Sequence, residues 1–203
     1  MSTTDSTATR SLIVVDVETT GLDPGVHFPL EVAAINVETR EVLHFVPKLN
    51  RAILEHADPE AMQINRYFER GTWRNASTVE ATVDAYKQLF SLLRGNTLAG
   101  TNPRFDAEMI RLGAAAAWTA ASESGYSEIV GPEVWHHRLA DLSAYAGPAL
   151  HRAPNELVGL ADVCEALGVT NSQPHTALGD AIATAECFRI LTQHYADRME
   201  PAS

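Results

Sequence analysis

Two acidic residues, Asp16 and Glu18, follow an apolar run near the start of the chain and precede Gly21. Side chains alternate between the faces of a strand, so residues two apart point to the same side. Carboxylates that lie close together either share a proton or bind a cation, and oxygen ligands favour hard ions such as Mg2+. The pair is therefore a candidate metal site, although a strand that turns polar at its solvent end explains it equally well.

Three further residues of suitable chemistry lie far along the chain. Asp106 falls in the first turn of an expected helix, where the helix dipole favours an acid whether or not it has a further role. His175 and Asp180 are five residues apart, which separates them by about 140° on an ideal helix, so they do not share one face. We expect His175 on the loop before the last helix, where a base can move, and Asp180 on the helix itself.

The hydrophobic pattern predicts an α/β fold that would position these residues. Expected strands cover residues 12–15, with Asp16 at the carboxyl end, and residues 30–37, 42–49, 97–100 and 134–139. Expected helices cover a short stretch from residue 59 and residues 78–94, 104–117, 157–167 and 176–195, and residues 122–132 form a loop.

Two groups of basic residues have more than one explanation. If the helix from residue 59 persists, Arg66, Arg70 and Arg74 form one cationic face, either a contact for backbone phosphates or a solvated surface. His136 and His137 are neighbours on an expected strand and so point to opposite faces. Structural or surface roles are therefore favoured for these histidines over joint binding of one metal.

The composition is that of one globular domain, which we place at residues 11–197 between short tails at 1–10 and 198–203. A net charge of -11 argues against nucleic-acid binding through a broad basic surface, although metal ions in an acidic site can still engage phosphates. No stretch has the length and apolarity of a membrane span or a secretory signal. We expect a cytoplasmic protein in which Cys164 and Cys187 are reduced, buried thiols.

Three motifs in this chain resemble those of the DEDDh (DnaQ-like) 3′–5′ exonuclease family, which includes polymerase proofreading subunits, RNase T and oligoribonuclease. The motifs cover residues 16–21, 102–106 and 175–180, in the family's order and at similar separations. Thr101 departs from the pattern, since many members have histidine there. The resemblance implies a ribonuclease H-like fold: a mixed five-stranded sheet, with the first three strands antiparallel, flanked by helices.

The resemblance also implies a two-metal mechanism. Two Mg2+ or Mn2+ ions would be bound by four carboxylates, those of Asp16, Glu18, Asp106 and Asp180. His175 would accept the proton of the attacking water, since its ordinary pKa of about 6.5 leaves much of the imidazole neutral at physiological pH. The expected reaction removes 5′-mononucleotides from a 3′ end.

The same resemblance suggests substrate contacts. Thr19 would lie near the terminal 3′ hydroxyl and Leu22 against the base. Phe105 would support stacking, although a core position explains this ring equally well. Asn102 would position Asp106 or a phosphate.

The expected substrate is a single-stranded or frayed DNA 3′ end. An RNA or oligoribonucleotide exonuclease is the alternative, because the same catalytic residues serve both sugars. A non-catalytic polymerase-accessory module would keep the fold but lose a ligand or the histidine, and all five of those residues are present. A DNA polymerase or another replication protein is a partner that the resemblance suggests.

Overall fold

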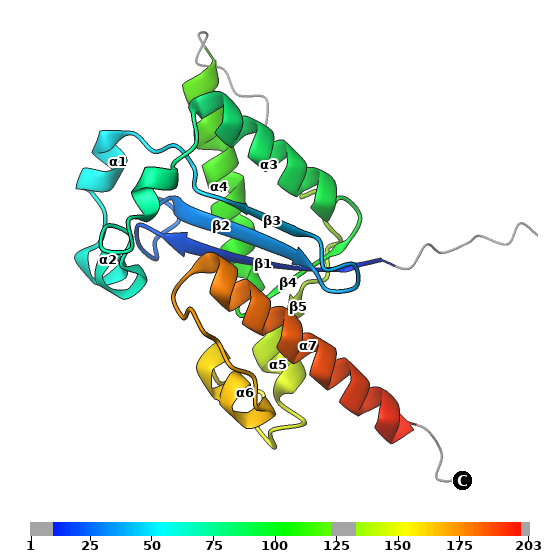
Figure 1. Cartoon of the computed structure of the whole chain (residues 1–203). Coiled ribbons are helices and arrows are strands. Elements are labelled where there is room, and N and C mark those ends of the chain that lie inside the picture. The colour runs from blue at the N-terminus through cyan, green and yellow to red at the C-terminus, as the bar shows by residue number, and fades with distance from the viewer. Residues whose placement is uncertain (1–9, 123–132, 200–203) are drawn as a thin grey trace, which may run out of the picture.

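The computed structural model describes residues 10–122 and 133–199 (Figure 1). Nearly all of the expected N-terminal tail, most of the expected loop at 122–132 and the end of the expected C-terminal tail lie outside the described residues. Within them, no helix is long and apolar enough to cross a membrane.

A five-stranded sheet in the order β3-β2-β1-β4-β5 forms the centre of the molecule. Its strands are β1 (Leu12–Thr19), β2 (Pro29–Asn36), β3 (Val42–Phe45), β4 (Thr97–Gly100) and β5 (Ala140–Asp141). The first three are antiparallel neighbours, whereas β4 runs parallel to β1 and β5 parallel to β4. This mixed sheet confirms the predicted ribonuclease H-like fold.

The strand boundaries differ from the prediction by more than one residue in three places. β1 continues past Asp16 to Thr19, because β2 remains paired with it that far. β3 ends at Phe45, four residues before the expected end. Residues 134–139 are not a strand, and only Ala140–Asp141 pairs with β4.

Residues 134–139, before β5, do not pair with a strand, because their backbone hydrogen bonds are either local or single bonds to another segment. The backbone N–H of His136 donates to the carbonyl of Asn96, and the His136 ring accepts from the backbone N–H of Arg138. The rings of His136 and His137 lie 4.2 Å apart. The prediction that they face opposite sides of a strand is therefore wrong.

Helices cover both faces of the sheet, as Figure 1 shows. Their bounds are α1 (Arg51–Glu55), α2 (Pro59–Asn65), the short 3-10 helix η1 (Thr72–Asn75), α3 (Val79–Leu93), α4 (Pro103–Ala121), α5 (Leu142–Ala146), α6 (Leu160–Leu167) and α7 (Ala177–Met199). α1 and α5 were not predicted, and α7 continues past the expected end at residue 195 to Met199.

The alternation of β1 divides the core into two layers. Ile13 and Val15 pack with α3 and α4, whereas Val14 packs with α6 and α7. The second layer contains Cys164 and Cys187, whose free thiols lie 3.7 Å apart, as expected of reduced cysteines. Both faces of β1 are thus buried, which agrees with its continuous apolar sequence.

The expected arginine face does not form. α2 ends at Asn65 because Arg66 adopts a left-handed conformation (φ 52°, ψ 38°), and the Asn65 side chain accepts a hydrogen bond from the backbone N–H of Tyr67. Arg70 consequently turns towards the sheet, where its side chain pairs with Glu31.

Candidate active site

Three carboxylates meet where α7 crosses the end of β1. Asp16 and Glu18 point to one face of β1, as their spacing predicts, and Asp180 comes from the first turn of α7. One oxygen of each lies within 4.8 Å of the others. Residues separated by more than 160 positions in the chain thus form a set of oxygen ligands of the kind that Mg2+ or Mn2+ prefers.

Asp106 reaches β1 from the first turn of α4. Its side chain is buried, with a relative exposure of 5%, and its Oδ1 accepts a hydrogen bond of 3.1 Å from the backbone N–H of Val17. It does not belong to the three-carboxylate set defined by mutual distance, but its charge is close enough to affect Asp16. The structure therefore places Asp106 beside the cluster, held by the backbone between two of its members.

Burial and mutual repulsion raise the pKa of every carboxyl in the site. Burial, followed by repulsion from Asp180, raises the pKa of Glu18 to about 8. Burial raises the pKa of Asp106 to about 8, although hydrogen bonds from backbone N–H groups oppose the shift. The pKa values of Asp16 and Asp180 are also raised, chiefly by burial. Four acids with too little compensating charge fit the binding of divalent cations, which would favour their ionised forms.

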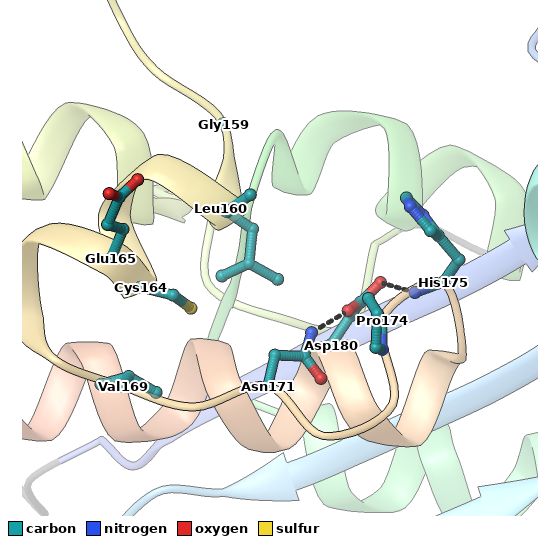
Figure 2. A pocket seen from close by; sticks show the side chains of 10 residues that line it. Gly159, Leu160, Cys164, Glu165, Val169, Asn171, Pro174, His175 and Asp180 are labelled. Carbon is teal, nitrogen blue, oxygen red and sulfur yellow. Dashed lines mark hydrogen bonds between the residues drawn. The ribbon is translucent and has the colours of Figure 1, made fainter.

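His175 lies on the loop that precedes α7, as predicted, in a left-handed conformation (φ 60°). Its backbone N–H donates to Oδ2 of Asp180 at 3.2 Å, and Figure 2 shows the ring extending away from that carboxylate. The ring makes no hydrogen bond with any residue that the structure describes. His175 is exposed to solvent.

The loop before α7 also fixes Asp180 from its other side. Asn171 donates a hydrogen bond of 2.5 Å to Oδ1 of Asp180 (Figure 2). The loop packs so closely on the first turn of α7 that a Cβ at Gly179 would collide with the carbonyl of Gln173. Asn171 was not predicted, and nothing in its local sequence distinguishes it from an ordinary loop residue.

A pocket of about 260 Å³ opens beside Glu18 and contains three of the predicted substrate-binding residues, Thr19, Leu22 and Phe105. Leu22 is 79% exposed, so its apolar side chain is accessible to a ligand in the pocket. The opposite wall was not predicted: it comes from α2 and includes Ala61, Ile64 and Asn65.

Asn102 does not line this pocket. It precedes α4 with φ 61°, and its side chain makes no capping hydrogen bond. Its side chain forms no hydrogen bond with Asp106 in the described structure, so the expectation that it positions this acid gains no support.

A fifth carboxylate, Glu31, lies next to Glu18 across β1 and β2. Its carboxylate forms hydrogen bonds with His44 and Arg70. Burial raises the pKa of Glu31, but these hydrogen bonds outweigh that effect, and the pKa is lowered. A lone charge in the otherwise apolar run of β2 was the signal that could have identified Glu31, because a buried charge requires partners. Nothing in the sequence indicates that Arg70 is one of them.

The strand order of the sheet, with an acidic cluster at the end of β1, is that of a ribonuclease H-like domain. A sequence model of the RNase T family, described as exonuclease, matches residues 13–188. The chain therefore belongs to the RNase T exonuclease family. No curated protein matched the chain.

Similar solved structures include exonuclease I from two organisms. The zinc-bound form of an E. coli exonuclease I–ssDNA complex has 22% identity and a TM-score of 0.70, covering 94% of this chain and 42% of that one. Exonuclease I from Methylocaldum szegediense has 21% identity and a TM-score of 0.65, covering 93% and 41%. These matches show a shared fold, and the chain spans about two fifths of their length.

Proposed function

We propose that the protein is a metal-dependent 3′–5′ exonuclease that removes 5′-mononucleotides from single-stranded or frayed DNA ends. One observation carries the proposal: the carboxylates of Asp16, Glu18 and Asp180 converge within 4.8 Å beside a pocket formed by Thr19, Leu22 and Phe105. An acidic cluster next to an apolar pocket can hold the scissile phosphate through cations while the pocket receives the terminal nucleoside.

Asp16, Glu18, Asp106 and Asp180 would hold two Mg2+ or Mn2+ ions, which when bound would activate water and stabilise the departing 3′ oxygen. His175 would accept the proton of that water on a ring nitrogen, since its imidazole is exposed and has no hydrogen-bond partner in the described structure. Asn171 and the backbone N–H of His175 would orient the Asp180 carboxylate.

The pocket favours an unpaired 3′ end. Leu22 and Ile64 are exposed apolar side chains that line the pocket together with Phe105, and such side chains suit stacking against an unpaired base. DNA is the favoured substrate because several of the similar solved structures are complexes with DNA, among them an E. coli exonuclease I–ssDNA complex and one with a dT13 oligonucleotide.

The test is digestion of a 5′-labelled single strand, as DNA and as RNA in parallel, with and without Mg2+. A ladder of products shortened from the 3′ end is expected, faster with DNA. His175→Ala and Asp106→Ala should each reduce the rate by about a hundredfold or more. Asp84→Ala, at an exposed carboxylate of α3, is the matched control.

Full activity of either active-site variant would refute the mechanism. A faster reaction with RNA would reassign the substrate. A wild-type protein that shortens neither strand would favour a non-catalytic accessory module instead.

A further inference from the structure

Glu31 is a buried carboxylate on the same face of the sheet as the proposed metal ligand Glu18. The two are paired across β1 and β2, so their side chains project in the same direction. The Glu31 side chain is only 4% exposed, and both its oxygens are engaged: Oε1 with Nε2 of His44 and Oε2 with Nη2 of Arg70, each at 2.8 Å. Both oxygens of Glu31 are thus held by basic side chains, and Glu31 is not part of the three-carboxylate set.

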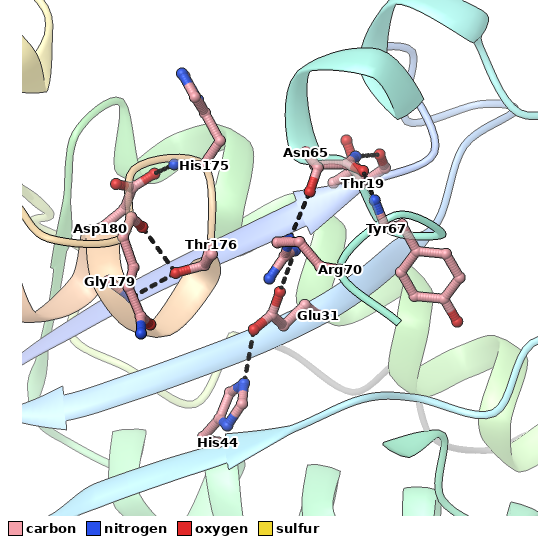
Figure 3. Close-up of polar contacts among 11 residues, drawn as sticks. Thr19, Glu31, His44, Asn65, Tyr67, Arg70, His175, Thr176, Gly179 and Asp180 are labelled. Atoms are coloured by element: carbon pink, nitrogen blue, oxygen red, sulfur yellow. Dashed lines mark hydrogen bonds and ion pairs between the residues drawn. The ribbon is translucent and has the colours of Figure 1, made fainter. Parts of the chain in front are cut away.

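Arg70 connects this carboxylate to the end of α2, as Figure 3 shows. While its Nη2 donates to Glu31, its Nε donates to the backbone carbonyl of Asn65 at 2.7 Å. Asn65 is itself buried, and its Nδ2 donates to the carbonyl of Thr19 at 3.1 Å. A continuous series of hydrogen bonds thus runs from β2 through Arg70 and Asn65 to the end of β1.

The same series supports the wall of the 260 Å³ pocket. Thr19 and Asn65 both line that pocket, whereas Glu31 and Arg70 do not. At the other end of α2, the backbone N–H of Asp58 donates to the carbonyl of Thr20. α2 is therefore attached at one end to Thr19 of β1 and at the other to Thr20, the residue that follows β1. Arg70 holds the carbonyl of Asn65, the residue that makes the attachment to Thr19.

We propose that Glu31 and Arg70 are positioning residues that set the width of the pocket for the terminal nucleoside by fixing Asn65 and the α2 wall against Thr19. This inference rests on the proposed exonuclease function. Because the wall faces the nucleoside and not the scissile phosphate, losing the connection weakens binding of the 3′-terminal nucleotide more than it slows the chemical step.

The decisive variant is Arg70→Lys. Lysine keeps a cation beside the buried Glu31, so we expect this variant to fold. Its single ammonium group cannot replace the planar guanidinium of Arg70, which donates to both Glu31 and Asn65. Arg70→Gln and Glu31→Gln remove the ion pair altogether, and their double variant tests coupling. Arg74→Gln is the matched control, since Arg74 lies in the same segment, is exposed and has no carboxylate partner in the described structure.

The measurements are KM and kcat on a short single strand, and binding of a nucleoside 5′-monophosphate, which occupies only the terminal pocket. In Arg70→Lys we expect KM and the dissociation constant of the mononucleotide to rise about tenfold, as loss of one charge-assisted hydrogen bond implies, with kcat within about threefold of wild type. The KM and the mononucleotide dissociation constant of the Glu31→Gln/Arg70→Gln double variant should be no higher than those of the poorer single variant. Arg74→Gln should behave as wild type.

Unchanged KM and mononucleotide affinity in Arg70→Lys, or a fall in kcat alone, would overturn the positioning role while leaving the exonuclease function intact. Absence of cleavage by the wild-type protein would instead overturn the proposed function. A lower melting temperature with unaltered kinetic constants would reduce the series to a purely structural role and so also refute the inference.

Discussion

Removal of divalent cations should leave a protein whose stability falls as pH rises. Burial raises the pKa of Glu18 from 4.5 to about 8 and that of Asp106 from 3.8 to about 8. An acid with a raised pKa keeps its proton in the folded state at a pH where the unfolded chain has already lost it. Its favourable contribution is therefore complete below the unfolded pKa and is lost progressively up to about pH 8.

The size of this loss of stability follows from the number of protons that the folded state retains and the unfolded chain has lost. Each group that titrates independently changes the free energy of unfolding by about 1.4 kcal/mol per pH unit. Since Glu18 and Asp106 interact, we count them as little more than one such group, which gives a loss of about 3 kcal/mol between pH 6 and pH 8. For a domain of this size that loss corresponds to a fall in Tm of about 6 to 12 °C.

The assay is thermal unfolding followed by circular dichroism from pH 5 to pH 9, in a chelator and again in excess Mg2+. A bound cation favours the ionised carboxylates, so Mg2+ should remove most of the fall. Glu18→Gln and Asp106→Asn should each flatten the chelator curve, whereas Asp84→Asn, at an exposed acid, should not. A metal-free Tm that is constant or rises over this range would refute the reasoning.

Three substitutions test other parts of the molecule. Asn171→Ala removes the side-chain donor to Asp180 and should raise the Mg2+ concentration for half-maximal activity by about tenfold or more in a metal titration. Leu22→Ala should change the free energy of unfolding by less than about 0.5 kcal/mol, because Leu22 is 79% exposed, yet raise KM severalfold in a steady-state assay. Leu89→Ala, at a fully buried position, should cost about 2 to 5 kcal/mol in urea unfolding without altering KM.

Local rules were sufficient to place most of the candidate catalytic residues. The two-residue period of a strand puts Asp16 and Glu18 on one face wherever β1 ends, so the error in its boundary did not affect the inference. The spacing of His175 and Asp180 does not allow both to lie on one face of a helix. The prediction that His175 lies on the preceding loop and Asp180 on the helix is confirmed. These conclusions required only backbone geometry over a few residues.

Contacts between distant segments could not be inferred in the same way. Glu31 and Arg70 are 39 residues apart, and Arg70 reaches the sheet only because the chain turns left-handed at Arg66. Left-handed conformations occur in this chain at arginine, asparagine and histidine residues alike, so the position of such a turn is not encoded by one residue type. The α2 wall of the pocket, and with it Asn65, was therefore missed.

The short pairing of β4 explains why acids from distant parts of the chain meet at one place. β4 pairs with β1 only from Leu12 to Val14, so the rest of β1 has a strand neighbour on one side alone. The backbone N–H of Val17 would lack a partner on the open side, and the first turn of α4 fills the gap when Asp106 accepts its hydrogen bond. A longer β4 would satisfy that N–H and displace Asp106. The early end of β4 is thus what brings an α4 carboxylate to the acids of β1.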